Sequence, residues 1–113
     1  MPMNKEVYFV ADTQEVLRSF PAEVRRMFGY EIMRLQQGLK PIHYRPMTKA
    51  IGAGVGELKV KYRGEYRVFY SVSLGNAVYV INAFRKKTQK TPHKELDLAR
   101  ARLTELKSTL RRN

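Results

Sequence analysis

Apolar and polar residues alternate with a period of two between Glu57 and Tyr70, which predicts two half-buried β-strands. The strands meet at Arg63-Gly64, where the glycine suits a tight turn. The apolar side of this predicted hairpin is formed by Leu58, Val60, Tyr62, Tyr66, Val68 and Tyr70. Because a slip of one residue would move half of this set into water, the pattern fixes which side chains face the core.

The polar side of the same hairpin concentrates positive charge. We expect a three-residue loop, 63–65, between the strands. In that register Lys61 lies opposite Arg67. Lys59 then lies opposite Phe69. Like charges that face each other destabilise a sheet by about 0.2–1 kcal/mol. The cluster therefore favours an anion that can also stack on an aromatic ring, and nucleic acid is such an anion.

The N-terminal part of the chain predicts one strand and two helices. Residues 6–10 form a short strand, and the capping-box pattern of residues 12–15 begins a helix that ends near Ser19. Pro21 suits the first turn of a second helix, and Gly38 suits its end. The apolar stripe of this second helix is Val24, Phe28, Ile32 and Leu35.

Residues 39–55 lack periodicity and contain prolines and glycines, so they predict a loop. After the hairpin, a turn at Gly75-Asn76 leads into a further strand, residues 78–84. Thr91 is the expected N-cap of the last helix, with Pro92 at its first position. The apolar stripe of the last helix is Leu96, Ala99, Leu103, Leu106 and Leu110.

These elements predict an α+β fold in the order β-α-α-β-β-β-α, with residues 1–113 as a single domain. The last three strands form an antiparallel meander, and the N-terminal strand joins the sheet only by returning from a distance. We expect the helices to pack on one face of a small antiparallel sheet. The face with Lys59, Lys61 and Arg67 is then open, because charges do not sit unpaired under a helix.

The overall charge agrees with a polyanionic partner. The chain has 22 Lys and Arg against 10 Asp and Glu, a net charge of +12 and a pI near 10.2. A solvated basic surface without a partner is the plain alternative. A membrane surface is a weaker candidate, because no segment is both strongly apolar and basic in the required geometry. Binding to nucleic acid is the leading implication.

Several classes of protein are disfavoured by composition. The chain has no cysteine, which removes disulfides and thiolate metal sites. His43 and His93 are its two histidines, and they lie far apart in sequence, so we expect no metal site and no cofactor. No apolar run reaches the length of a membrane span, and residues 7–11 are too short for a signal peptide. We expect a cytoplasmic protein without a membrane partner.

Two further segments are basic. Residues 85–90 read Arg-Lys-Lys-Thr-Gln-Lys, and no acid occurs between Arg85 and Lys94. The predicted loop adds Lys40, Arg45 and Lys49. A solvated loop is the alternative interpretation of each segment. Such groups suffice for RNA cleavage by the 2′-hydroxyl, because cations stabilise the phosphorane, and a lysine crowded by other cations can transfer a proton.

The motifs GELKVKYRGEYRVFY, VYVINAFRKKTQKTP and KELDLARARL resemble the RelE/ParE superfamily of bacterial toxins, closest to its HigB-like, phage-derived branch. The similarity runs from about Val7 to Leu106. It implies a RelE-like fold and the toxin of a type II toxin–antitoxin pair. RelE-type members cut mRNA in the ribosomal A site without a metal. The implied partners are a cognate antitoxin, expected to be a small helix-turn-helix protein, and the ribosome with its mRNA.

The resemblance also implies a set of site residues. The expected catalytic residues are Lys59, Lys61, Arg67, Lys86 and Lys87, with Arg67 at the position that contacts the scissile phosphate. Expected RNA contacts around them are Arg45, Lys49, Arg63, Phe69, Arg85 and Lys90. Glu57 matches a strand glutamate of the branch, and His93 lies near the place where RelE has a catalytic tyrosine. This chain has no tyrosine beyond Tyr79, so the general acid and base stay unassigned.

Two other functions fit the same sequence. ParE-type members of the superfamily poison DNA gyrase, and the chain could be such a non-enzymatic inhibitor. It could also be a plain nucleic-acid-binding module of a mobile element. The clustered cations on the sheet favour the nuclease, because a gyrase inhibitor does not need phosphate ligands there.

Overall fold

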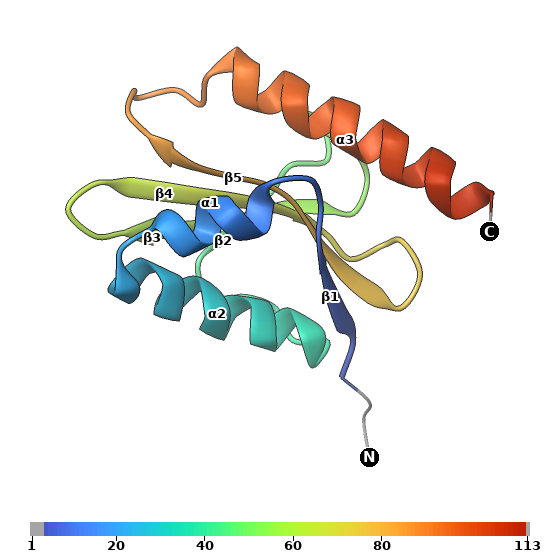
Figure 1. The fold of residues 1–113 in the computed structure, drawn as a ribbon, viewed down its shortest axis with the longest axis horizontal. Helices are drawn as coiled ribbons and strands as arrows, with labels where there is room; N and C mark the ends of the chain where they lie inside the picture. The colour runs from blue at the N-terminus through green and yellow to red at the C-terminus, as the bar shows by residue number, and fades with distance from the viewer. Residues whose placement is uncertain (1–3, 113) are drawn as a thin grey trace.

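The computed structural model of the chain describes residues 4–112. This part of the chain forms a mixed α+β fold with one sheet between two layers of helices (Figure 1). Its strands are β1 (Glu6–Phe9), β2 (Tyr44–Pro46), β3 (Val55–Lys61), β4 (Glu65–Ser71) and β5 (Ala77–Lys86). Its helices are α1 (Thr13–Ser19), α2 (Ala22–Gln36) and α3 (His93–Arg111).

The sheet has the strand order β1-β5-β4-β3-β2. The pairs β2–β3, β3–β4 and β4–β5 are antiparallel, which confirms the predicted meander. The N-terminal strand returns from a distance, as expected, and pairs with β5. The pair β1–β5 is parallel, however, so the expectation of a fully antiparallel sheet is wrong at this edge. Two helices and three strands separate β1 from β5 along the chain, so no tight turn holds the two strands antiparallel.

The helices cover both faces of the sheet, so the expectation that they pack on one face is wrong. Helices α1 and α2 lie against one face, with Val24 and Phe28 buried on Leu58 and Val68. Helix α3 lies against the other face and buries Leu103 in a second core cluster (Figure 1). The second cluster also contains Phe69, Tyr79, Ile81 and Phe84 from the sheet. Strand β5 is apolar on both sides, which is typical of a strand covered twice.

The local signals for the first two helices are confirmed, although their caps differ from expectation. Helix α2 begins directly after Pro21. Gly38 lies just beyond the end of the helix and has a φ of +77°. Asp12 makes no side-chain cap. Instead, its carboxylate accepts a hydrogen bond from Arg102 of α3 at 2.8 Å. This hydrogen bond therefore links α3, on one face of the sheet, to the start of α1 on the other face.

Two further boundaries differ from the sequence-based expectation. The segment 39–55 contains strand β2, which pairs with residues 56–58 and was predicted as loop. Pro41 lies three residues before this short strand and Pro46 is its last residue, and these prolines hide its pattern. The last helix begins at His93 with Pro92 at the cap position, one residue later than predicted, so Thr91 is not its N-cap.

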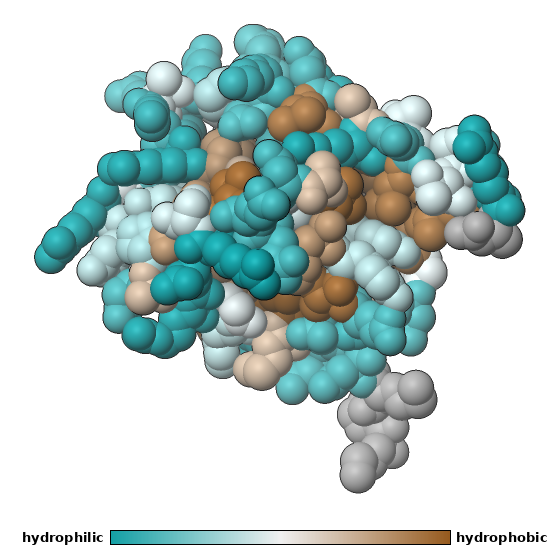
Figure 2. Space-filling view, in the orientation of Figure 1, coloured by the Kyte–Doolittle hydropathy of each residue, from teal (hydrophilic) through white to brown (hydrophobic). Residues whose placement is uncertain are grey.

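The surface of this part of the chain is mixed. In the orientation of Figure 1, hydrophilic side chains cover most of the outline, and a hydrophobic band crosses the middle between α3 and the layer of α1 and α2 (Figure 2). Neither α1, α2 nor α3 has the length and apolar character that a membrane crossing requires.

Candidate nucleic-acid interface

The β3–β4 hairpin is paired two residues away from the predicted register. Lys59 lies opposite Arg67, and Lys61 lies opposite Glu65. The loop consists of residues 62–64 rather than 63–65, because Arg63 adopts a φ of +51° and Gly64 one of +142°. A shift of two residues keeps every side chain on its predicted face, so the hydrophobic pattern could not distinguish the two registers.

Arg67 is the centre of the basic face and is 5% exposed. Its Nη2 lies 3.3 Å from Glu65 Oε1, and its Nη1 donates to the Tyr66 carbonyl at 3.2 Å. Its Nε lies 3.5 Å from Glu57 Oε1, an electrostatic contact in which neither atom makes a hydrogen bond. The expectation of an open, uncompensated arginine is therefore wrong. Arg67 is held in the sheet because two carboxylates neutralise its charge.

Glu57 is fully buried and links two arginines. Its carboxylate accepts a hydrogen bond from Arg45 of β2 at 3.5 Å and lies 3.3 Å from the same guanidinium at its other oxygen. Arg45 is half exposed, so it closes the outer side of the buried pair formed by Glu57 and Arg67. The geometry gives Glu57 a positioning role for both arginines.

Lys59 and Lys61 are exposed beside this buried pair, on the same face of β3 as Glu57. Glu65 offsets part of their charge. A hydrogen bond from Arg67, and then the positive charge of Arg67, lower the pKa of Glu65 below its usual value. Glu65 is therefore ionised at neutral pH and keeps the Arg67 guanidinium in place.

A second group of cations lies over the same face of the sheet. Arg45, Lys49, Lys86 and Lys90 line a cavity of about 700 Å³ between the segment after β2 and the segment after β5. The two segments are about forty residues apart in sequence, and the cavity brings their charges together. Lys86 also lies opposite Glu65 across the β4–β5 pair, next to Arg67. The two basic groups therefore meet at Arg67.

Other predicted contacts lie elsewhere. Phe69 is fully buried with its ring 5.3 Å from that of Phe84, so the prediction that it stacks on RNA is wrong. Arg63 is exposed at the tip of the hairpin. Arg85 lies over the Tyr66 ring and donates to the Arg63 carbonyl at 3.2 Å. Tyr66 belongs to the core cluster on the side of α1 and α2, so the Arg85 side chain points away from the basic face.

Lys87 and His93 are the two remaining predicted site residues. Lys87 is exposed just after β5. His93 is exposed as the first residue of α3 and lines none of the cavities around Arg67. Neither residue is placed against the buried ion pair.

One functional candidate was missed by sequence reasoning. His43 lines a cavity of about 390 Å³ together with Lys59, Lys61, Glu65 and Arg67. It precedes the short strand β2, and its carbonyl accepts a hydrogen bond from Lys59 N at 3.1 Å. Recognition of β2 as a strand beside β3 would have placed His43 next to Lys59.

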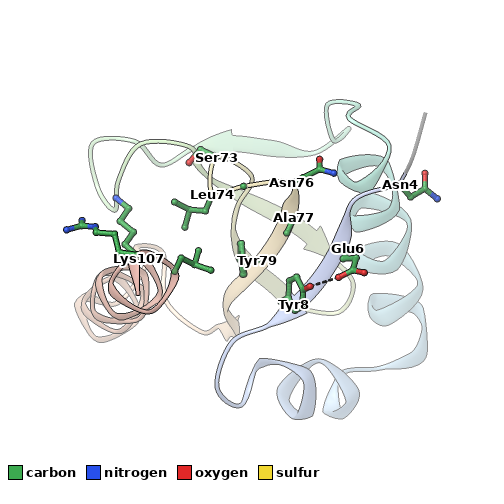
Figure 3. A pocket seen from close by; sticks show the side chains of 12 residues that line it. Asn4, Glu6, Tyr8, Ser73, Leu74, Asn76, Ala77, Tyr79 and Lys107 are labelled. Carbon is green, nitrogen blue, oxygen red and sulfur yellow. Dashed lines mark hydrogen bonds between the residues drawn. The ribbon is translucent and has the colours of Figure 1, made fainter. Parts of the chain in front are cut away.

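The largest cavity described lies apart from the basic face. It measures about 820 Å³ and lies between β1, the β4–β5 turn and the end of α3 (Figure 3). Tyr8 and Tyr79 stack in it at 5.4 Å, and Tyr8 donates a hydrogen bond to Glu6, which raises the pKa of Tyr8 above its usual value. Its cations, Lys107 and Arg111, do not cluster with those around Arg67. The largest cavity described is therefore not the one that gathers the predicted site residues.

Comparison with known families gives one match. The model of the family described as "Phage derived protein Gp49-like (DUF891)" matches residues 15–104. The match spans α1 to most of α3 and includes every residue named above around Arg67. No individual curated protein matches the chain. Among residues 4–112, no three His, Cys, Asp or Glu side chains are grouped as metal ligands would be.

Proposed function

The chain belongs to the Gp49-like family of phage-derived proteins, a family of RelE-like toxins, and from this premise we propose that it is the toxin of a type II toxin–antitoxin pair that cleaves mRNA on the ribosome. Its motifs resemble those of the HigB-like branch, and we propose that it belongs to that branch. Its partners are then a small helix-turn-helix antitoxin, the ribosome and mRNA in the cytoplasm. The reaction uses no cofactor.

The observation that carries this proposal is the setting of Arg67. A buried, pre-positioned guanidinium next to exposed lysines is what a phosphate in the transition state requires. Glu57 and Glu65 fix its orientation before any ligand arrives. Lys59 and Lys61 then supply the net positive charge that an RNA backbone needs.

The proposed reaction is attack of the RNA on itself. A base removes the proton of a 2′-hydroxyl, and the 2′ oxygen forms a bond to the adjacent phosphorus. The bond from phosphorus to the 5′ oxygen breaks, and an acid protonates that oxygen. The products are a 2′,3′-cyclic phosphate and a 5′-hydroxyl end. No oxidant, reductant or water is consumed in this step.

Each role has a candidate in the site. Arg67 stabilises the charge of the phosphorane, and Lys59 and Lys61 bind the phosphates on either side. His43 lies in the same cavity, and imidazole is the side chain that ordinarily exchanges protons near neutral pH, so His43 is our candidate for the missing acid or base. Lys86, Lys87 and the cations of the 700 Å³ cavity bind RNA further along the strand.

Controlled expression with pulse labelling tests this function. The chain without its antitoxin should stop incorporation of labelled amino acids before it affects incorporation of thymidine. Lys59→Gln/Lys61→Gln should abolish the arrest. Arg18→Gln/Arg25→Gln removes the same charge from exposed positions of the α1–α2 layer and should leave the arrest intact. Both double variants are compared at equal protein level.

Each other outcome identifies an alternative. If DNA synthesis stops first, the chain is a gyrase inhibitor of the ParE type. If neither synthesis stops while the purified chain still binds RNA, it is a nucleic-acid-binding module. If both double variants lose activity equally, total charge and not the site on β3 is responsible.

A further inference from the structure

The cavity of about 820 Å³ lies where helix α3 leaves part of the sheet uncovered (Figure 3). Glu6 pairs with Ala77 and Tyr8 pairs with Tyr79 across the β1–β5 ladder, so the four side chains lie on one face of the sheet. Ala77 and Tyr79 belong to the core cluster under α3. Tyr8 is nevertheless 47% exposed, because α3 packs on β5 rather than on β1.

An aromatic platform forms one side of this cavity. The Tyr8 ring stacks on the Tyr79 ring, with centroids 5.4 Å apart and planes inclined by 22°. Tyr79 is buried, whereas Tyr8 is about half exposed and lines the cavity. The Tyr8 hydroxyl donates a hydrogen bond to the Glu6 carboxylate, which helps to hold the ring in place. The exposed side of such a fixed ring is suited to stacking with a planar ligand.

The opposite wall of the cavity is basic. Lys107 and Arg111 are four residues apart on α3, so they lie on the same side of the helix, and Figure 3 shows Lys107 across the cavity from Tyr8. Within residues 4–112 neither of them forms an ion pair, although Arg100 and Arg102 of the same helix do. A lysine and an arginine one helical turn apart can hold a phosphate group between them.

We propose that this cavity binds a free nucleotide, with its base on Tyr8 and its phosphate at Lys107 and Arg111. Glu6 is the acid of the cavity and lies at the base end, where a carboxylate accepts N–H groups and repels a phosphate. The volume agrees with one small ligand, because pockets for such molecules measure about 300–1,000 Å³.

This site is distinct from the proposed RNA groove at Arg67. Ala77 and Tyr79 lie at the start of β5, whereas Lys86, next to Arg67, lies at its end. The strand has ten residues, so its two ends are about 30 Å apart at about 3.3 Å per residue. One mononucleotide cannot touch both sites. Nucleotide binding here therefore goes beyond the proposed RNA cleavage and does not depend on it.

The test titrates the full chain with AMP, with adenosine and with ribose 5-phosphate by calorimetry, while NMR follows the backbone amides of residues 77–79. AMP should bind at least about tenfold more tightly than either fragment, because both of its ends have partners, and it should shift these amides. Lys59→Gln/Lys61→Gln should bind AMP with the affinity of the parent, which separates this cavity from the RNA groove.

Tyrosine variants test the base end of the site. Tyr8→Ala should weaken binding of AMP and adenosine about tenfold and leave ribose 5-phosphate unchanged, because stacking is lost. Tyr8→Phe keeps the ring and should bind AMP within about twofold of the parent. Tyr30→Ala is the matched control, since Tyr30 is 49% exposed on α2 and does not line the cavity. Urea unfolding of the three variants confirms that they are folded.

Lysine variants test the phosphate end. Lys107→Gln should weaken binding of AMP about five- to tenfold but leave adenosine unchanged, because adenosine has no phosphate. Lys94→Gln removes the same charge from an exposed position at the other end of α3, outside the cavity, and should change neither affinity.

Three results would overturn the proposal: no binding of AMP, equal binding of AMP and ribose 5-phosphate, or an AMP affinity that neither Tyr8→Ala nor Lys107→Gln changes. One nucleotide of an RNA strand has the same chemistry as a free nucleotide, so an adenosine trinucleotide is titrated into Lys59→Gln/Lys61→Gln. It should bind no more tightly than AMP. Binding more than about tenfold tighter through Tyr8 and Lys107 would assign the site to RNA and not to a free nucleotide.

Discussion

Arg67 combines the charge on which the proposed function depends with a buried position, and two carboxylates make this possible. A guanidinium that is 5% exposed is tolerated because Glu57 and Glu65 lie 3.5 and 3.3 Å from its nitrogens. The arrangement is also rigid, since Tyr66 and the β4–β5 pairs surround it. At the scale of single residues, the site is thus a buried ion pair that presents its charge to a cavity lined by lysines and one histidine.

Removal of this guanidinium should destabilise the fold as well as the site. Arg67→Ala leaves the buried Glu57 carboxylate without Arg67, and we expect a loss of about 3–5 kcal/mol in the free energy of unfolding. The control Arg26→Ala breaks the exposed pair with Glu23 and should cost less than about 1 kcal/mol. Urea denaturation measures both.

A second substitution shows whether the uncompensated carboxylate is the cause. Adding Glu57→Gln to Arg67→Ala should recover part of the lost stability, because the amide carries no charge into the interior. If Arg67→Ala costs no more than Arg26→Ala, the buried pair is not important for the fold, and Arg67 is better described as a surface residue.

His43 and His93 form a natural pair for testing the chemistry. His43→Gln should lower cleavage about 10²–10⁴-fold, because proton transfer is lost. His93→Gln should leave cleavage unchanged, since His93 lies outside the cavity. RNA binding by both variants should stay within about twofold of the parent. Cleavage by His43→Gln at the rate of the parent would remove His43 from the mechanism.

The sequence predicted the face of the sheet on which each hairpin residue lies, but not the residue opposite it on the neighbouring strand. Lys59, Lys61 and Arg67 were expected on one face of the sheet, and the structure has them there. The burial of Arg67 beside Glu65 could not be predicted, because the register is set by the turn at Arg63-Gly64 and not by the apolar pattern. His43 was missed for a related reason, since its position depends on a strand of three residues that ends in a proline.

At the scale of elements, the sandwich of α1 and α2, the sheet and α3 determines what is accessible. Helix α3 covers the apolar part of the second face, where Phe69 and Phe84 lie, and leaves the end with Lys59 and Lys61 exposed. Alternation in β3 and β4 was read as one buried face and one open face. The continuous apolar run in β5 carried the missing information that both faces are covered.

Replacement of two glycines in these elements by alanine should change the stability of the fold in opposite directions. At Gly56 of β3 an added Cβ would lie 2.3 Å from the Tyr70 hydroxyl and 2.4 Å from its ring, and Tyr70 is itself buried. Gly56→Ala should cost about 1–3 kcal/mol of stability by overpacking. At Gly29 of α2 nothing lies within 4 Å of the added atom, so Gly29→Ala should stabilise by about 0.5–1 kcal/mol.

Thermal and urea unfolding of the two glycine variants check this prediction. Equal effects of the same sign would mean that the contact between β3 and Tyr70 does not constrain the sheet. The comparison is independent of the functional proposal, because neither glycine lines the cavities around Arg67.

At the scale of the whole molecule, the fold brings part of the positive charge of the chain together in one region. Segments after β2 and after β5 add Arg45, Lys49, Lys86 and Lys90 to the lysines of β3. Net charge alone indicated a polyanion, but it could not indicate this convergence, which depends on the strand order. The same convergence favours the proposed RNA-binding groove over a uniformly basic surface.

This convergence gives a salt dependence that can be measured. Binding of single-stranded RNA should weaken with salt by a slope of about −0.7 for each phosphate neutralised. Six Lys and Arg side chains other than the buried Arg67 line the two cavities, so we expect a slope of about −4 in a plot of log K against log salt. Lys59→Gln/Lys61→Gln should reduce its magnitude by about 1.4. A slope that does not change in this variant would place the RNA elsewhere.

The central claim is that this chain cuts mRNA during translation, and the most direct test is to map 5′-hydroxyl RNA ends after brief induction. Wild type and Arg18→Gln/Arg25→Gln should produce new ends within translated reading frames, and Lys59→Gln/Lys61→Gln should produce none. Growth arrest with intact mRNA, or ends spread equally over untranslated RNA, would contradict ribosome-dependent cleavage by the site at Arg67.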